Sequence, residues 1–374
     1  MTQQVAFKVG LLGPSRVGKT SLITALFSEA QQLLAGSGVA MMPDGRATDD
    51  KIAANREQLQ GDILAREFSP GSLAGNLEPF TFKFVLDPGV AGARIGIELL
   101  DFPGGWLDGR VRNSQSDADW ESCRAFITQS TVLLVPVDAA LLMETFEKQH
   151  IRLLPRFLTT AQVDEVVREW AVNRARRPHE PALIAFAPVK CEAYFNDNGG
   201  LRNQSHQLRK KFDSVYKDVV ATVRANAPHA QLLYTPIDTI GCVEMVKAAW
   251  KQVDDAWTFD AMYHVRNDRT ISRLGAKDLM TALCQQLIHG KRMMTADESE
   301  ILRQRAVQAR ELAERSEGFF RDILMWLNRE RQARNDAATR RDQESQEVER
   351  RLIALDDVLQ RIANRPFGPR VQRL

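Results

Sequence analysis

The chain has 374 residues, which is enough for a large hydrophobic core and one appendage, since a single domain usually takes roughly 100–200 residues. Its composition, 44% hydrophobic and 26% charged, is ordinary for a soluble protein, and a net charge of +2 gives no indication of nucleic-acid binding. We expect a cytoplasmic protein without a signal peptide, because an apolar strand begins within a few residues and no apolar run reaches the roughly 18 residues of a membrane span. No C-x-x-C spacing suggests a zinc site or a disulfide framework for Cys123, Cys191, Cys242 and Cys284.

A glycine-rich loop follows the first apolar run, which spans Val5 to Leu12 and is predicted to be a buried strand. Residues 13–20 read GPSRVGKT, a complete Walker A motif. Its glycines let backbone N–H groups surround phosphates at the start of a helix, whose dipole favours an anion. We expect Lys19 to neutralise the β and γ phosphates and Thr20 to offer its hydroxyl to Mg²⁺. The expected nucleotide-binding residues of this loop are Gly13, Ser15, Arg16, Val17, Gly18, Lys19, Thr20 and Ser21.

A second motif, D-x-x-G, stands at Asp101 to Gly104, directly after the apolar run 95–100. This strand is expected to carry Asp101 to the carboxyl edge of the sheet beside the Walker A loop, where it holds Mg²⁺ directly or through water. Gly104 is expected to give its backbone N–H to the γ phosphate. Such a contact exists only while the γ phosphate does, so hydrolysis would release the following segment, as in a switch.

Slow hydrolysis is predicted from two positions near these motifs. The D-x-x-G motif resembles the start of switch II in P-loop GTPases, where the next residue is often a Gln that orients the attacking water. Here that residue is Gly105, and Ser15 replaces a third glycine found in many efficient GTPases. Arg16 and Arg110 are candidates for stabilising transition-state charge, with surface solvation as their alternative role. The candidate catalytic residues are Lys19, Arg16 and Gly104.

A base-recognition segment is expected after the apolar run 182–188. P-loop GTPases read guanine with an N/T-K-x-D segment, whereas this chain has Val189-Lys190-Cys191-Glu192. Lys190 is expected to pack on the base and Glu192 to accept from it, although Glu192 is one methylene longer than the usual Asp. This departure leaves guanine specificity open. A further strand, 231–238, would place the loop 238–241 near the base.

Residues 13–22, 101–106 and 189–192 together resemble a TRAFAC-class P-loop GTPase over roughly residues 1–290. The stretches 99–107 and 240–244 are similar to the bacterial YcjX-like P-loop proteins. The resemblance implies an α/β fold, the three-layer Ras-like P-loop NTPase fold with a mostly parallel sheet, and it implies GTP and Mg²⁺ as ligands.

Between the two phosphate motifs we expect a helix from Lys19 to about Leu34, followed by an irregular insertion. Switch I is expected within 36–79, where Thr48 is one of several hydroxyl residues that can reach Mg²⁺. Residues 49–68 within this insertion have helical spacing, and 80–86 read as an edge-type strand.

The second half of the domain begins with a central strand, 132–138, predicted to be buried on both faces. Pro136 is expected near its end, where the hydrogen-bond ladder has already stopped. The segment 139–178 is predicted to be helical, with a break or kink at Pro155. Residues 242–290 mix helix with a short strand-like piece at 259–265.

The segment 291–365 is predicted to be a helical hairpin or coiled-coil arm, and 366–374 a flexible tail. Packing of the two halves against each other is one reading of the arm. The other is a partner or membrane surface built on aromatic residues and arginines, of which the protein partner is favoured over the membrane. The apolar seam of the second half consists of Val348, Leu352, Leu355, Leu359 and Ile362. The predicted partner or membrane surface is built on Phe319, Phe320, Trp326 and Leu327.

The sequence therefore predicts a GTP-binding switch that hydrolyses GTP slowly and whose nucleotide state is coupled to a protein partner through the arm. Homo-oligomerisation through the seam is also compatible with the pattern, and no nucleic-acid partner is expected. Two alternatives stay open, a P-loop ATPase and a scaffold that keeps a nucleotide without hydrolysing it.

Overall fold

The computed structural model describes residues 7–66, 68, 77–89, 94–254, 256–289, 351 and 353–374. One eight-stranded sheet organises them, in the order β10-β7-β6-β5-β1-β4-β3-β2. The five central strands are parallel, whereas β10, β3 and β2 pair antiparallel with their neighbours. The bounds are β1 (Phe7–Leu11), β2 (Ala40–Pro43), β3 (Phe80–Asp87), β4 (Ile95–Asp101), β5 (Val132–Asp138), β6 (Leu183–Val189), β7 (Gln231–Tyr234) and β10 (Gln372–Arg373).

The central strands are buried on both faces because helices cover the sheet on both sides. Every residue of β6 is buried, and so is every residue of β5 except Asp138, which is half-buried. Such continuous apolar runs are typical of a covered parallel sheet. Pro136 lies beyond the point where β1 stops pairing with β5, at Leu134, so its missing N–H removes no bond to β1. The ladder with β6 continues as far as Asp138, so the expectation for this proline is confirmed on the β1 side only.

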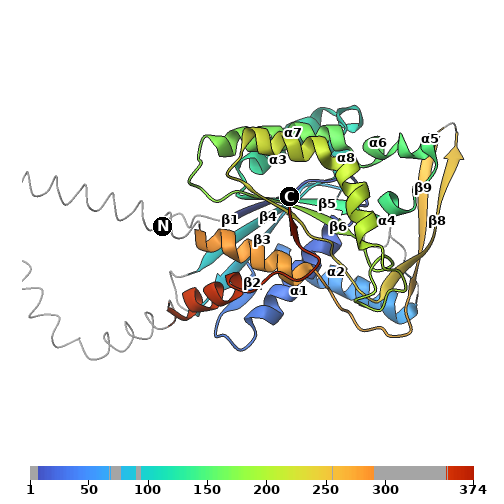
Figure 1. Ribbon diagram of the computed structural model, residues 1–374. Coiled ribbons are helices and arrows are strands. Elements are labelled where there is room, and N and C mark those ends of the chain that lie inside the picture. The colour runs from blue at the N-terminus through green and yellow to red at the C-terminus, as the bar shows by residue number, and fades with distance from the viewer. Residues whose placement is uncertain are drawn as a thin grey trace, which may run out of the picture.

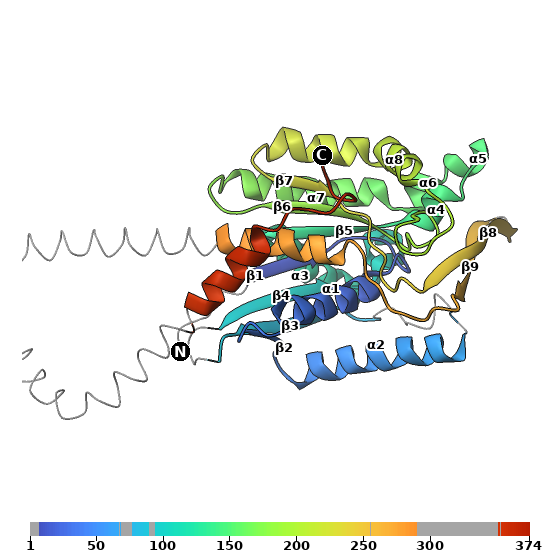
Figure 2. The same ribbon diagram turned by 60° about the horizontal axis from the view of Figure 1, so that its bottom comes forward.

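Three layers result, with the sheet in the middle (Figure 1). One face is covered by α3 (Ser114–Gln129), α7 (Thr160–Ala175) and α8 (Ser205–Asn226). The other face is covered by α1 (Lys19–Leu34), whose bounds agree with the prediction, and by helical residues 276–289 and 353–363. The helix α2 (Arg46–Ala65) lies outside α1 at the β2 end of the sheet, as Figure 2 shows.

The insertion after α1 is more regular than expected. It contains β2, which pairs with β3 from Ala40 opposite Asp87 to Pro43 opposite Phe84. The prediction of an edge strand at 80–86 was therefore wrong, because β2 covers β3 and becomes the edge itself. The expected helix within the insertion is present as α2.

The segment 139–178, predicted to be helical with one break or kink, forms four helices. They are α4 (Ala139–Met143), α5 (Lys148–Ile151), α6 (Leu154–Phe157) and α7. Pro155 stands in the first turn of α6, where its missing N–H costs no intrahelical bond, so it starts a helix instead of kinking one.

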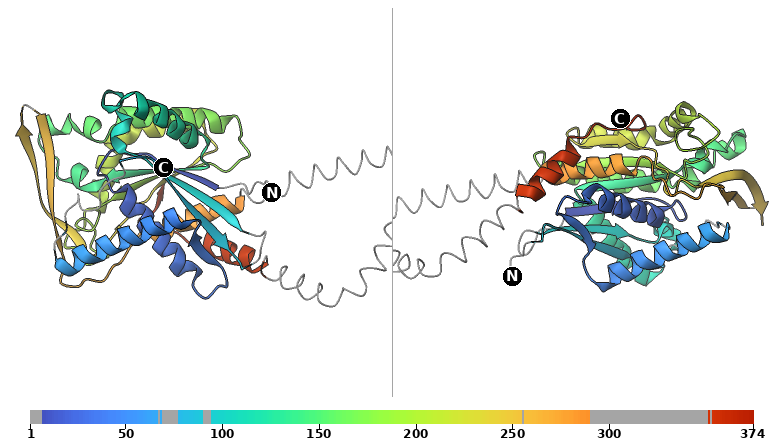
Figure 3. Two further views of the ribbon diagram at one scale, coloured as in Figure 1. Left: turned by 180° about the vertical axis from the view of Figure 1, so that it is seen from behind. Right: turned by 90° about the horizontal axis from the view of Figure 1, so that it is seen from below.

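A two-stranded ribbon, β8 (Val243–Val253) and β9 (Ala256–Val265), extends past the main sheet (Figures 1 and 3). The strand-like piece predicted at 259–265 is present as part of β9, whereas β8 was not predicted. Its Trp250 ring stacks on His150, with 4.8 Å between ring centroids, and meets Phe157 of α6 edge-on. These aromatic contacts hold the end of the ribbon where β8 ends and β9 begins against α5 and α6.

The C-terminal residues are part of the domain. The helix at 353–363 buries Leu355, Leu359 and Ile362, three residues of the predicted arm seam, in the same core cluster as β1 and α1. The predicted flexible tail at 366–374 instead contributes β10 to the sheet, and Leu374 donates its N–H to Leu232. Apolar contact with the domain explains the seam without a partner helix for these residues.

Part of the predicted arm, 291–350, lies outside the described residues, together with Leu352. Within the part of the chain that is described, no helix has both the length and the apolar character required to cross a bilayer.

Candidate functional site

The Walker A loop connects β1 to α1 at the carboxyl edge of the sheet. Gly18 has φ 109°, and Arg16 has φ 62°, so the loop uses the left-handed region at two positions. A Cβ on Gly13 would lie 3.2 Å from both Cγ and O of Pro136, which ties the loop closely to β5. Of the remaining loop residues, Ser15 and Arg16 are exposed, Val17 is buried and Ser21 is half-buried.

Lys19 is the buried cation of this loop, with only 8% of its surface exposed. Its Nζ donates to the carbonyl oxygens of Gly13 and Pro14, at 3.0 Å each. Burial lowers the pKa of Lys19, and the negative charge of Asp101 opposes this shift. The ammonium group is therefore held at the centre of the loop, where phosphate oxygens would improve its electrostatic environment.

Asp101 and Thr20 meet as the sequence predicts. β4 lies beside β1 in the sheet, so the carboxyl end of β4 brings Asp101 to the first turn of α1. The Thr20 hydroxyl donates to Asp101 Oδ2 at 3.2 Å. Burial raises the pKa of Asp101, while Lys19 and the bond from Thr20 lower it. A hydroxyl and a carboxylate are hard oxygen donors of the kind that Mg²⁺ prefers, so the pair fits this ion.

Gly104 packs directly on the Walker A loop. A Cβ at this position would lie 2.6 Å from the carbonyl oxygen of Pro14 and closer still to the adjoining backbone atoms up to Ser15 N. Only glycine allows this approach. Gly105 beside it has space, since a Cβ there would have Ser15 Oγ as its nearest neighbour at 3.7 Å.

Lys190, which follows β6 directly, also contacts the Walker A loop. Its Nζ donates to the carbonyl oxygen of Arg16 at 3.0 Å and to Asp138 Oδ2. Asp138 is a site residue that was not predicted from the sequence, although its place at the end of β5, in register with Val189, is a usable signal. Asp138 also caps α4 by accepting from Leu141 N. The ion pair thus joins three loops at the sheet edge.

Glu192 has a different orientation from the one expected for base recognition. Its side chain is 4% exposed, and Oε1 accepts from the backbone N–H groups of Ile240 and Gly241 at 3.2 Å each. Burial, together with the charge of Asp238, raises the pKa of Glu192 to about 7. The structure therefore brings Glu192 and the loop 238–241 together, but it directs this carboxylate oxygen to the loop backbone.

Arg370 is a second residue that the sequence did not reveal, because it stands in the predicted tail. Only 6% of it is exposed, and it forms ion pairs with Asp197 and with the fully buried Asp238. Its guanidinium carbon also lies 4.1 Å from the centre of the Phe195 ring. The C-terminal segment therefore holds the loop that follows β7.

Other candidate residues have local structural roles. Arg110 is exposed and donates through Nε and one NH₂ group to Asp108. Thr48 is buried, and its hydroxyl accepts from Lys83 N on β3 at 3.1 Å. These contacts place neither side chain at the Walker A loop.

Comparisons with known proteins leave the chemistry to be inferred from this geometry, as no family model matches the chain and no curated protein sequence matches it significantly. The described residues contain no group of three or more His, Cys, Asp or Glu side chains that would hold a metal by themselves. The site consists of the buried ammonium group of Lys19, the hydrogen-bonded pair of Thr20 and Asp101, and the Walker A loop, whose backbone is in close contact with Gly104.

Proposed function

We propose that this protein is a GTP-binding switch that requires Mg²⁺ and hydrolyses GTP slowly. The observation that carries the proposal is the convergence of Lys19, Thr20 and Asp101 at one sheet edge, from two separate sequence motifs. Lys19 would hold the β and γ phosphates, and Thr20 and Asp101 would hold Mg²⁺, which supplies charge neutralisation between phosphate oxygens. The antiparallel strand β3 next to β4, in a sheet that is otherwise parallel at its centre, is compatible with a Ras-like GTPase domain.

The switch step follows from the contact between Gly104 and the Walker A loop. Gly104 lies on Pro14 and Ser15, so any change in the loop on phosphate binding reaches residues 104–107 directly. A γ phosphate that accepts from Gly104 N would fix this segment, and its loss would release it. The helical arm is the proposed route from this movement to a protein partner, with association of two chains through the arm as a second outcome.

Slow hydrolysis is supported by what surrounds Gly105. No side chain is present at this position to orient water, and Ser15 Oγ occupies its neighbourhood. Arg110 is engaged by Asp108, whereas Arg16 is exposed on the loop and is the better placed arginine to contact phosphate. An arginine from a partner would serve the same purpose.

An ATPase is the second candidate, and the orientation of Glu192 favours it. Oε1 of Glu192 already accepts hydrogen bonds from Ile240 N and Gly241 N. To recognise guanine, Glu192 would have to use its other carboxylate oxygen or change its conformation. Lys190 would still stack on either base, since stacking does not distinguish adenine from guanine.

The experiment is a titration of nucleotide-free protein with labelled GTP and ATP, with and without Mg²⁺. We expect a preference for GTP that Glu192→Ala removes, and loss of all nucleotide binding in Lys19→Ala. Lys83→Ala, which changes an exposed lysine on β3, is the matched control and should bind as the parent does. Retention of ATP over GTP would select the ATPase, and binding that survives Lys19→Ala would refute the site.

The scaffold alternative predicts binding without turnover. Single-turnover measurements with excess protein separate it from slow hydrolysis, because bound GTP would then remain intact over many hours.

A further inference from the structure

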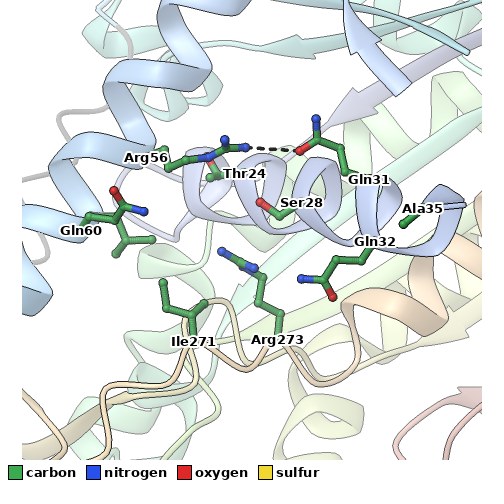
Figure 4. A pocket seen from close by; sticks show the side chains of 10 residues that line it. Thr24, Ser28, Gln31, Gln32, Ala35, Arg56, Gln60, Ile271 and Arg273 are labelled. Carbon is green, nitrogen blue, oxygen red and sulfur yellow. Dashed lines mark hydrogen bonds between the residues drawn. The ribbon is translucent and has the colours of Figure 1, made fainter. Parts of the chain in front are cut away.

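A cavity lined by both polar and apolar residues lies beside α1, away from the Walker A residues 13–20. Its volume is about 390 Å³, and α1, α2 and the loop after β9 enclose it (Figure 4). A cavity of this size suits a small molecule. Its lining residues are Thr24, Ser28, Gln31, Gln32, Ala35, Arg56, Leu59, Gln60, Ile271 and Arg273.

Two arginines from different elements face this space. Arg273 extends from its loop toward Ser28, and Arg56 reaches in from α2, where it donates to Gln31 at 3.4 Å (Figure 4). The Nε atom of Arg273 is buried and has no hydrogen-bond partner among the described residues. A buried guanidinium N–H without an acceptor is unusual, because its desolvation is then uncompensated.

The charge around the cavity is positive. Arg273 interacts with Arg56 and with Glu29, and Glu29 also interacts with Lys277. The cavity lining itself contains two arginines, Arg56 and Arg273, and no carboxylate, an excess of positive charge that matches an anion. Burial lowers the pKa of Arg273, the charge of Glu29 opposes this shift, and Arg56 adds to it, so a bound anion would further stabilise the charged guanidinium.

Of the remaining lining residues, five carry uncharged donors and acceptors, and Ala35, Leu59 and Ile271 are apolar. Gln31, Gln32 and Gln60 each carry an amide, and Ser28 carries a hydroxyl, all at the cavity wall. Such groups pair with hydroxyls of a ligand, while a bare phosphate would leave most of the space unfilled.

We propose that this cavity binds a small sugar phosphate, with Arg273 and Arg56 on its phosphate group and the glutamine amides on its hydroxyls. A phosphomonoester carries about −1.5 to −2 charges at neutral pH and accepts bidentate bonds from arginine. The site is separate from the Walker A loop and does not rest on the proposed nucleotide function. The cavity and the Walker A loop both use residues of α1. Thr24 at the cavity wall donates to the carbonyl oxygen of Thr20 at 3.0 Å.

The test is isothermal titration calorimetry with ribose 5-phosphate, with ribose and inorganic phosphate as separate arms. The host is Lys19→Ala, so that phosphate binding at the Walker A loop is removed. We expect ribose 5-phosphate to bind with a dissociation constant below about 1 mM, and more tightly than either ribose or inorganic phosphate. Equal affinity for inorganic phosphate, or no binding at this concentration, would overturn the proposal.

Three further variants in the same host locate the binding. Arg273→Gln and Arg56→Gln should each weaken it about tenfold or more, and Arg269→Gln should leave it unchanged. Arg269 is the matched control because it is a half-buried arginine of the same loop region, donates to Leu64 O at 3.5 Å and does not line the cavity. Arg56 is exposed on α2, so its variant decides the question if Arg273→Gln fails to fold. Unchanged affinity in Arg56→Gln would overturn the assignment.

Discussion

Replacing Gly104 by alanine tests the contact between the D-x-x-G segment and the Walker A loop. The new Cβ would stand 2.6 Å from Pro14 O, and real Cβ atoms essentially never approach another heavy atom within 3.0 Å. The atoms it meets are all backbone, so no side chain can rotate away. Either the loop or the segment 104–107 must move, by roughly an ångström, and overpacking of this kind costs about 1–3 kcal/mol.

The matched control is Gly105→Ala, one residue further on. Its Cβ would have nothing nearer than Ser15 Oγ at 3.7 Å, an ordinary van der Waals distance. Both variants reduce the conformational freedom of the unfolded chain equally, a gain of about 0.4–1 kcal/mol, so the difference between them reports the clash alone. Urea denaturation measures the free energy of unfolding for each variant.

We expect Gly104→Ala to be less stable than Gly105→Ala by about 1–3 kcal/mol, and to bind nucleotide more weakly if the Walker A loop is the part that moves. Equal unfolding free energies, within about 0.5 kcal/mol, would show that Gly104 does not pack on the loop as described. A stability loss with normal nucleotide affinity would mean that 104–107 moves instead.

Three other variants have defined outcomes. Arg370→Met leaves the buried Asp238 without its cation and should cost about 3–5 kcal/mol in chemical denaturation, whereas the exposed Arg373→Met should change stability by less than about 0.5 kcal/mol. Burial raises the pKa of Glu192 to about 7 from its ordinary 4.5, so its contribution to stability is full below pH 4.5 and is lost as the pH rises to 7. Glu192→Gln, compared with the parent by denaturation at pH 4.5 and pH 8, should therefore gain relative stability at the higher pH, by up to roughly 3 kcal/mol, and a constant difference would contradict the raised pKa. Asp101→Asn should weaken nucleotide binding about tenfold or more in Mg²⁺ and little in EDTA, measured by fluorescence titration; an equal loss in both would argue against a metal role.

Local sequence patterns predicted the elements near the Walker A loop well. Residues 13–20 are contiguous, so the Walker A motif needs no distant partner to be recognised, and the helix that follows it has the predicted bounds, 19–34. The D-x-x-G motif was placed beside it correctly because parallel strands bring their carboxyl ends to one edge.

Segments with weak or misleading local patterns were predicted less well. The four-residue β2 was too short to stand out, and without it β3 was taken as an edge. Residues 366–374 resemble a flexible tail because Pro366, Gly368 and Pro369 break any periodicity, yet the segment ends in a strand of the main sheet. In both cases pairing with a distant strand supplied the structure.

The sequence by itself determined the Walker A loop, the D-x-x-G segment and the central strands β1, β4, β5 and β6 that carry or flank them, because each depends on neighbouring residues or on a continuous apolar run. Only the tertiary structure decided which charged groups meet. Asp138 and Lys190 are 52 positions apart, and Asp238 and Arg370 are 132 apart. It also decided that Glu192 faces a backbone loop and that Arg273 faces a cavity. Contacts of this kind depend on how the chain packs, and burial then sets their energy, so no local pattern encodes them.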